Sequence, residues 1–573
     1  MITHCRKYDD RLCFLKAVLF TVWLCVVEST QPLNAEVLDR PISESLPPLP
    51  HFIEKSLKRN LPEVRFPDPA EGSVSSTINF GSSVWVSEFT FEGNHFVNTE
   101  TLSEVTGDFE NQQLTYEQLV GLRDKLSLIY INLGYVTSGV KLPSIVKHGV
   151  VTFNIVEGEL GEVHVVGAKR LAEDYIRARI KVPTGEIVNV IEIENRLKIA
   201  QLNPLINYFE ARLEPTSKPG VSDLNIQVHE NKAHGFEIVV GNMLSPAVSS
   251  DAVQASFSHG NLSGRGDEFN AFYQVSEGLD EYGLSYKLPL VKLRSNLGVH
   301  YHRSDAEAQE RPFTALDIES ETFTAGFSLD HKYQKDLNTL LRFTEIIEYR
   351  ESNSFLLGRG FSFSAGADEG VARVVAVRLG QELIHRKAAR VIAFRSRLSF
   401  GVKKYDDFSQ GAEPDGDFIS WLGQGQIAQK FEFLDSLVVL KGDFQWANDP
   451  LPGLEQYSLG GRSTVRGYRE NQVAGDKGWL ASVEWRIPLL RKASGEPALE
   501  LATYADTGRA CNHERSTSSA QRLSSGGIGL LLNLGNYFQA EIFIAERFNN
   551  LPDSSNERDL QDDGIHFRIR SRF

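Results

Sequence analysis

The feature that most constrains this chain is a long run of alternating strands without helix. From Gly235 to Phe573, about 340 residues read as short strands separated by turns. Segments such as "VVLKGDFQWA" (438–447), "WLASVEWRI" (479–487) and "IHFRIRSRF" (565–573) put apolar side chains on one face and polar ones on the other. A water-soluble sheet protein also alternates in this way. The charges on the polar faces and the length of the region favour a transmembrane antiparallel β-barrel of about sixteen strands, at roughly 21 residues per strand and loop.

The N-terminus has the pattern of an export signal, which we expect to cover residues 1–35. Basic residues precede an apolar run from Ala17 to Val27, which is too short for a membrane-spanning helix, and cleavage is expected after Ala35. A membrane anchor is the alternative interpretation of the same segment. Three of the four cysteines fall inside it, so the mature chain keeps only Cys511 and forms no intramolecular disulfide.

Composition excludes several classes of function. The net charge is −15 and no basic block occurs, which argues against nucleic acid as a partner. The sequence contains no Gly-x-Ser-x-Gly elbow, no HExxH, no phosphate-binding loop and no Cys/His cluster. We therefore expect no catalytic residues, no metal and no cofactor.

Two similar modules are expected between the export signal and the barrel. Residues 36–83 read as a Pro- and Ser-rich linker, in which only 51–60, "HFIEKSLKRN", could form a short helix. Residues 84–158 follow a strand, helix, helix, strand, strand order, with helices expected at 99–104 and 116–133. The same order returns in residues 159–231, with helices expected near 172–180 and 190–202.

The stretch "GGRSTVRGYREN" (460–471) is a glycine-rich, basic turn between expected strands. Gly467 permits a sharp backbone, and Arg466 carries a planar fork of donors suited to a carboxylate. Asp506 lies on a strand whose apolar residues Leu499 and Leu501 have odd numbers, so its side chain is expected to point into the barrel and to need a partner there. The alternative is that Arg466 is an ordinary solvated loop arginine.

These motifs carry a family resemblance. Val465-Arg466-Gly467-Tyr468 follows the glycine pair Gly460 and Gly461, and a later strand carries Tyr504-Ala505-Asp506-Thr507-Gly508. Together with the terminal aromatic Phe573, which looks like the sorting signal of outer-membrane barrels, they resemble the transporters of two-partner secretion. Those transporters, the filamentous haemagglutinin and haemolysin secretion-activation proteins, couple POTRA modules to a barrel.

The resemblance implies a location and a function. The barrel would lie in the bacterial outer membrane with both POTRA modules in the periplasm. The pore would recognise a partner exoprotein by its N-terminal secretion domain and translocate it to the cell surface. Asp506 and Gly508 would receive the loop that carries Arg466, and residues 51–60 would be the candidate plug helix. Outer-membrane lipid and the barrel-assembly machinery are further implied partners. A barrel-assembly insertase and a passive porin or receptor are the alternatives.

Overall fold

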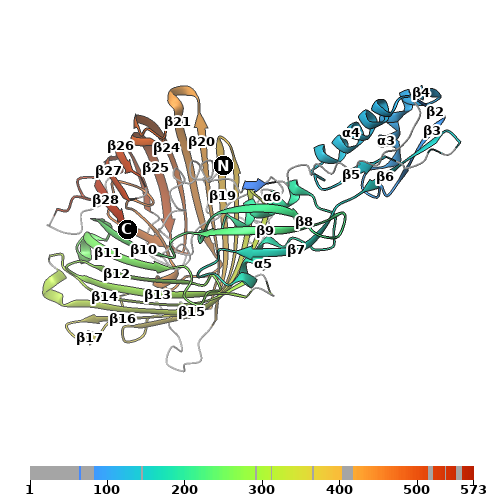
Figure 1. Cartoon of the computed structure of the whole chain (residues 1–573). Coiled ribbons are helices and arrows are strands. Elements are labelled where there is room, and N and C mark those ends of the chain that lie inside the picture. The colour runs from blue at the N-terminus through green and yellow to red at the C-terminus, as the bar shows by residue number, and fades with distance from the viewer. Residues whose placement is uncertain are drawn as a thin grey trace. The chain divides into compact units, whose positions relative to one another are not determined.

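The chain folds into two compact units, Arg59–Asn231 and a unit that contains Lys232–Phe573 (Figure 1). The computed structural model describes residues 63–65, 83–142, 146, 148–290, 293, 295–311, 313–363, 367–402, 417–513, 521–535, 537–549 and 558–573. The expected export signal (1–35) and the candidate plug helix (51–60) lie outside the described residues. Among the helices that are described, none is both long and apolar enough to cross a membrane.

The first module packs two helices on a small sheet. Its elements are β2 (Val84–Val86), β3 (Glu88–Glu92), α3 (Thr99–Thr106), β4 (Gln112–Leu114), α4 (Tyr116–Asn132), β5 (Gly139–Lys141) and β6 (Val150–Val156). Helix α4 begins at a capping box, in which Thr115 and Gln118 bond each other's backbone N–H groups, and Gly134 follows its end with a positive φ. Leu122, Leu126 and Tyr130 are fully buried at helix spacing and form one core with Phe153 of β6.

The second module repeats this order with β7 (Glu159–Val166), α5 (Glu173–Ile180), α6 (Val190–Ala200), β8 (Ile206–Pro215) and β9 (Val221–Glu230). Its sheet has the order β1-β8-β9-β7, and β1 (Glu63–Arg65) runs parallel to β8. Strand β1 comes from the segment that was expected to be only linker. Three residues between Pro62 and Pro67 therefore complete the edge of a sheet far along the chain.

A glutamate at the end of the last strand of each module shows that the two modules are structural repeats. Glu157 accepts the N–H groups of His95 and Phe96 at 2.9 and 3.0 Å. Glu230 accepts those of three residues in the equivalent turn, Lys169, Arg170 and Leu171, at 2.9–3.1 Å. Burial raises the pKa of Glu230, but these donors outweigh it and hold the pKa below its usual value. Each glutamate thus fixes the turn that leads into its module's first helix.

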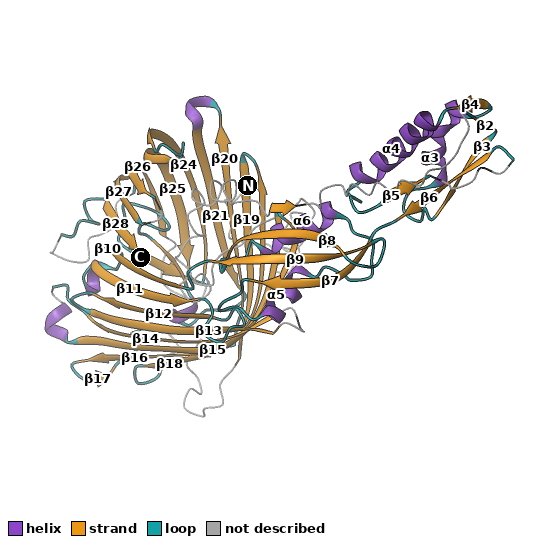
Figure 2. Cartoon of the chain, in the orientation of Figure 1, coloured by secondary structure: helices purple, strands orange, loops and turns teal. Residues whose placement is uncertain are grey.

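The second unit is a closed antiparallel barrel, which confirms the predicted fold (Figure 2). Sixteen long strands form its wall: β10 (His234–Asn242), β11 (Asp251–His259), β12 (Glu268–Val275), β13 (Leu279–Leu290), β14 (Ser295–Glu307), β15 (Ile318–Asp336), β16 (Thr339–Leu356), β18 (Val371–Lys387), β19 (Arg390–Val402), β20 (Ile419–Phe431), β21 (Ser436–Ala447), β24 (Lys477–Arg491), β25 (Pro497–Cys511), β26 (Gln521–Leu534), β27 (Phe538–Arg547) and β28 (Ile565–Arg572). The two-residue β17 (Arg359–Gly360) only extends the connection between β16 and β18.

The two faces of the wall differ as the alternation requires. On β21, Leu440 and Phe444 are about half exposed, whereas Asp443 and Gln445 are buried. The exposed apolar side chains recur around the barrel, as at Phe327 and Ile347, which are 65% and 60% exposed. An apolar outer surface of this extent requires lipid, and the inward charges require a polar interior. The alternative interpretation, a water-soluble sheet protein, is thereby excluded.

The barrel closes at a short seam between β10 and β28. The strand ladder there covers Glu237–Gly241, with two further backbone bonds between Phe236 and Phe573, whereas β10 pairs with β11 along its whole length. Beyond the ladder, Asn242 continues the closure with its side chain: its Nδ2 donates to the carbonyl of Ile565, and its Oδ1 accepts the N–H of Phe567, both at 2.8 Å. The amide of Gln561 donates to the carbonyls of Asn242 and Leu244 at 3.1 and 2.7 Å.

We expect Asn242→Ala to weaken the barrel at this seam. The change leaves one buried N–H and one buried carbonyl without partners, which costs about 1–3 kcal/mol. The folded, heat-modifiable band on a denaturing gel should disappear at a temperature several degrees lower than for the wild type. A large domain is expected to lose roughly 2–4 °C per kcal/mol. Asn270→Ala is the control, because the one side-chain bond of Asn270 to the described part of the chain is a long one of 3.5 Å to Ser285 within the wall. Equal shifts for the two variants would contradict a special role for the seam.

Candidate functional site

The candidate site is the loop between β21 and β24, residues 448–476, which we call the inward loop. It contains a small hairpin of β22 (Tyr457–Leu459) and β23 (Val473–Gly475). Val465 and Tyr468, both predicted site residues, are fully buried in one apolar cluster with Leu459. A connection between two membrane strands is usually solvated, so this burial shows that the loop folds back against the inner wall.

Glycines allow the tip of the loop to turn this tightly. Gly460 has a φ of +112°, and a Cβ on it would lie 2.4 Å from the carbonyl oxygen of Arg469. Gly467 has a φ of +90°, and its Cβ would lie 2.6 Å from the methyl group of Ala545 on β27. No other residue type adopts these conformations without strain and a clash. Gly461, also at positive φ, lies against the carboxylate of Glu470.

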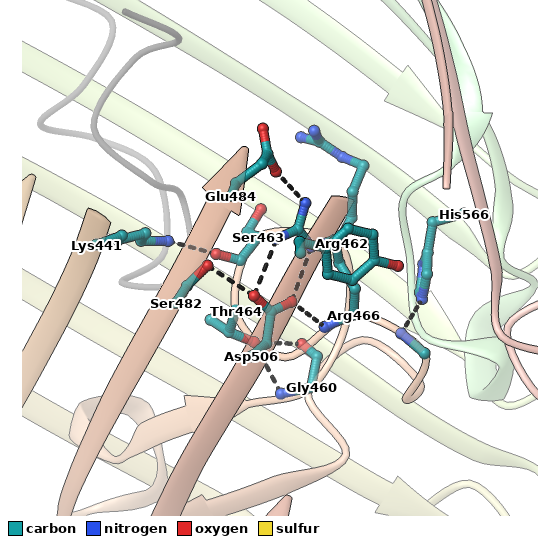
Figure 3. A network of polar contacts seen from close by, with 12 residues as sticks. Lys441, Gly460, Arg462, Ser463, Thr464, Arg466, Ser482, Glu484, Asp506 and His566 are labelled. Atoms are coloured by element: carbon teal, nitrogen blue, oxygen red, sulfur yellow. Dashed lines mark hydrogen bonds and ion pairs between the residues drawn. The ribbon is translucent and has the colours of Figure 1, made fainter. Parts of the chain in front are cut away.

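The centre of the site is the Arg466–Asp506 pair (Figure 3). The guanidinium donates from Nε to Oδ2 at 2.8 Å and from Nη2 to Oδ1 at 2.9 Å, and the backbone N–H of Arg466 adds a third bond at 3.1 Å. The Asp506 side chain is fully buried and that of Arg466 is 7% exposed. The family resemblance implied this pair, and the structure brings the two residues together with the planar, two-point geometry of an arginine–carboxylate fork.

Further side chains complete the pocket around the guanidinium. Its Nη1 is bonded to Glu484 of β24, and Ser482 donates its hydroxyl to Asp506 at 2.6 Å. The guanidinium carbon lies 3.5 Å from the ring centroid of Tyr504 and 4.9 Å from that of Phe543, which favours a cation over the aromatic faces. Sequence reasoning did not assign Glu484 or Phe543 to the site. The alternation of "WLASVEWRI" does place Glu484 on the inward face, but only the fold shows which inward carboxylate faces the loop.

The rest of the tetrad is fixed to strands near the end of the chain. The N–H of Gly467 donates to Nε2 of His566 on β28 at 2.9 Å. The Tyr468 hydroxyl lies 3.0 and 2.8 Å from the carbonyls of Ser524 and Asn549. Gly508 makes room for the loop, since a Cβ there would lie 3.0 Å from the side chain of Leu459.

Phe573 is the one predicted residue that the structure places apart from the loop. It lies at the seam, where it exchanges backbone bonds with Phe236 at 2.8 and 3.4 Å, and its side chain is 69% exposed. Its position is that of an accessible chain end rather than a part of the pocket.

The inward loop also holds charged contacts outside the tetrad. Arg469 donates to both oxygens of Asp562 at 2.6 and 2.7 Å and to Glu310 at 2.8 Å. Arg462 donates to Glu541 of β27 at 2.6 Å. Among the described residues, no group of His, Cys, Asp or Glu could hold a metal ion. The arrangement can bind a loop tightly by charge, and it presents no assembled acid, base and nucleophile.

Comparisons with known proteins agree over both units. Residues 220–532 match the family model described as haemolysin secretion/activation protein ShlB/FhaC/HecB, and residues 84–158 match the POTRA domain, ShlB-type. The chain is 23% identical over 463 residues to the outer membrane transporter CdiB of Dickeya dadantii (strain 3937), covering 77% of this chain and 79% of that protein.

Two solved structures share the fold. CdiB from Escherichia coli superimposes with a TM-score of 0.61 at 18% identity, covering 91% of this chain and 95% of that one. BamA from Haemophilus ducreyi lacking POTRA domains 1–3 gives a TM-score of 0.55 at 13% identity, covering 86% and 100%.

We expect Arg466 and Asp506 to be strongly coupled in the stability of the barrel. Arg466→Ala leaves the buried Asp506 carboxylate without its arginine, while Glu484 keeps its contact with Arg486. Leaving one buried charge unpaired costs more than removing both members of the pair. In a double-mutant cycle with Asp506→Ala, followed by urea unfolding, the coupling should be on the order of 1 kcal/mol or more. Arg466→Lys should recover only part of the loss, because an ammonium cannot reproduce the two-point fork.

The control is Arg303→Ala. Arg303 pairs with Asp305 where both side chains are more than a third exposed, so its loss should be close to neutral. Strict additivity of Arg466→Ala and Asp506→Ala would show that the pair does not hold the loop.

Proposed function

Because the chain belongs to the ShlB/FhaC/HecB family of haemolysin secretion/activation proteins, we propose that the inward loop is the gate of a pore for one secreted partner protein. The chain is a transporter of two-partner secretion, with its barrel in the outer membrane and its POTRA modules in the periplasm. The finer steps, namely capture by the modules, release of the loop and passage of the partner, are our proposal. The observation that carries it is the buried Arg466–Asp506 pair, which closes the loop onto the wall.

The loop contacts strands on widely separated parts of the wall. Its Glu455 bonds Arg378 on β18, and its Arg466 bonds Asp506 on β25. Between β18 and β25 the wall has four strands, β19, β20, β21 and β24. A single loop that contacts both must extend across part of the interior. A polypeptide in transit therefore needs the loop to leave at least one of these contacts.

The modules supply sheet edges for capture. In the first module the sheet order is β3-β6-β5, so β3 and β5 each have one neighbour among the described strands. In the second module the edge at β8 already carries β1, which demonstrates that an extended segment fits there. An unfolded N-terminal secretion domain of the partner would add to such an edge as a further strand.

The mechanism uses no catalytic step of this chain. Partner folding at the cell surface would draw the polypeptide outward, because a folded domain cannot return through the pore. Outer-membrane lipid would cover the apolar outer face of the barrel. The exposed ring of Phe573 would serve the barrel-assembly machinery as a recognition signal during insertion of the chain.

A barrel-assembly insertase is the alternative that shares this fold. The likeness to BamA supports it only as a fold, since the identity is 13%. A passive porin or receptor explains the barrel but gives the two modules no role. Loss of an insertase lowers the amounts of many outer-membrane barrels, whereas loss of a dedicated exporter affects one secreted protein.

We expect deletion of residues 84–158 to stop export while the barrel still inserts, because capture and conduction belong to different units. The partner is sought first in the neighbouring reading frame, which we expect to encode a large secreted protein. It is then followed by immunoblot in the medium, and insertion is followed by the heat-modifiable band. The charge-neutral surface change Arg123→Ala/Asp124→Ala in the same module is the control, since this adjacent pair is exposed. Normal export after the deletion would show that the first module is not the receptor, and a decline of other barrels would favour the insertase.

A further inference from the structure

A second buried ion pair joins the inward loop to the wall. The loop connects β21 to β24, and this pair lies on the β21 side at β18, whereas the Arg466–Asp506 pair lies on the β24 side at β25. Glu455, 2% exposed, ends the short 3-10 turn η8 (Gly453–Glu455) of the loop. Arg378 of β18, 1% exposed, donates from Nη1 to Oε2 at 2.9 Å and from Nη2 to Oε1 at 2.7 Å. Like the Arg466–Asp506 pair, this is a two-point fork between a loop side chain and a wall side chain. Here, however, the wall supplies the arginine.

The wall around Arg378 is rich in further arginines. Arg350 of β16 donates from Nη1 to the carbonyl of Leu454 at 3.1 Å, and the same nitrogen lies 3.6 Å from Glu455. Arg397 of β19 lies within electrostatic reach of Arg378 and Glu455. Its buried Nε, like that of Arg378, has no hydrogen-bond acceptor among the described residues. We call Arg350, Arg378 and Arg397 the arginine cluster.

The wall itself does not neutralise this cluster. Its nearby carboxylate is Glu348 of β16, which bonds Arg350 and Arg378 at 2.5 and 2.9 Å. Three guanidinium groups against one wall carboxylate leave a charge of +3 − 1 = +2, and Glu455 of the loop lowers it to +1. The loop therefore supplies a charge that the strands leave missing, at a place where an unpaired cation is costly.

A neighbouring ion-pair network shows that this arrangement is not a general property of the wall. Arg342 of β16 pairs with Glu382 of β18 at 3.2 Å and lies 3.6 Å from Asp330 of β15. All three residues belong to wall strands and sum to +1 − 2 = −1, so the wall itself supplies more than enough carboxylate for Arg342 without any residue of the inward loop. Of these two networks, only the arginine cluster receives a carboxylate from the inward loop.

We propose that the arginine cluster is a carboxylate-binding site of the pore, which Glu455 fills at rest and acidic side chains of the polypeptide in transit fill when the loop leaves. The inference rests on the proposed movement of the inward loop. When Glu455 departs, an incoming Asp or Glu side chain can make the same fork to Arg378, so one charge-assisted pair replaces another. The loop is then released by exchange, which avoids the cost of an empty, desolvated cluster.

The test uses purified full-length protein in planar lipid bilayers with decaglutamate as the probe and decaglutamine as the uncharged comparison. Glu455→Gln removes the resident carboxylate but keeps the size of the side chain. We expect decaglutamate to block the current of this variant at a concentration about tenfold lower than for the wild type, as one charge-assisted pair gained at the site implies. Decaglutamine should block both proteins equally, and Glu455→Gln/Arg378→Gln should return to the wild-type threshold.

Glu382→Gln is the matched control, because it removes the same charge from the same wall in the network that the loop does not touch. Its threshold should equal that of the wild type. An unchanged threshold in Glu455→Gln, or the same decrease in Glu382→Gln, would overturn the proposal. If Glu455→Gln does not insert into membranes, Glu455→Asp replaces it, since a shorter carboxylate cannot reach both nitrogens and should give a threshold below that of the wild type. The bilayer measurement contains no secreted partner. A failure of the carboxylate-site proposal is therefore distinguishable from a failure of the proposed export function, which is measured in cells.

Discussion

A guanidinium buried in a barrel needs its counter-charge within hydrogen-bonding distance, and the position of the inward loop follows from this requirement. The charge of Arg466 is neutralised by Asp506 and Glu484, which lie on the adjacent strands β25 and β24. The ring of Tyr504 lies against the guanidinium and restricts its orientation. Since the backbone at Gly467 must then approach β27 within contact distance, one conformation of the tip satisfies the charge and the space together. Such a pair is stable while water is excluded and loses much of its strength when water enters, which suits a closed state that must also open.

The same loop connects the pore to the closure of the barrel. Its Gly467 bonds His566 on β28, and the N–H of Glu470 donates to Gln561 at 2.8 Å. Gln561 in turn holds the end of β10 by two carbonyls. The seam has the short backbone ladder of Glu237–Gly241, so these side-chain bonds form a large part of its closure. Movement of the loop tip therefore changes contacts at the seam as well as in the lumen.

Opposite charges are distributed between loop and wall in two complementary ways. At Arg466 the loop supplies the cation and the wall the carboxylates, whereas at Glu455 the loop supplies the carboxylate and the wall the cations. Both pairs are almost fully buried, so neither loop residue can leave without exposing an unpaired wall charge. A polypeptide that carries both kinds of charge can replace each of them. The loop thus presents to the wall the same two kinds of charged side chain, a cation and a carboxylate, as a polypeptide that the pore is proposed to conduct.

The sequence by itself determined the barrel, the helices of both modules and the inward direction of Asp506, because each follows from a local signal: period-2 alternation, helix spacing with Gly134 after the end of α4, and the parity of Asp506 on its strand. The choice of Arg466 as the partner of Asp506 came from the family resemblance of the two motifs. The tertiary structure alone decided which distant residues meet. No local pattern places Glu455 on Arg378, 77 residues away in the chain, or a three-residue segment of the linker on the edge of β8. Strand parity specifies whether a side chain faces the lumen, but the barrel's closure and the path of the loop specify which other side chain it faces there.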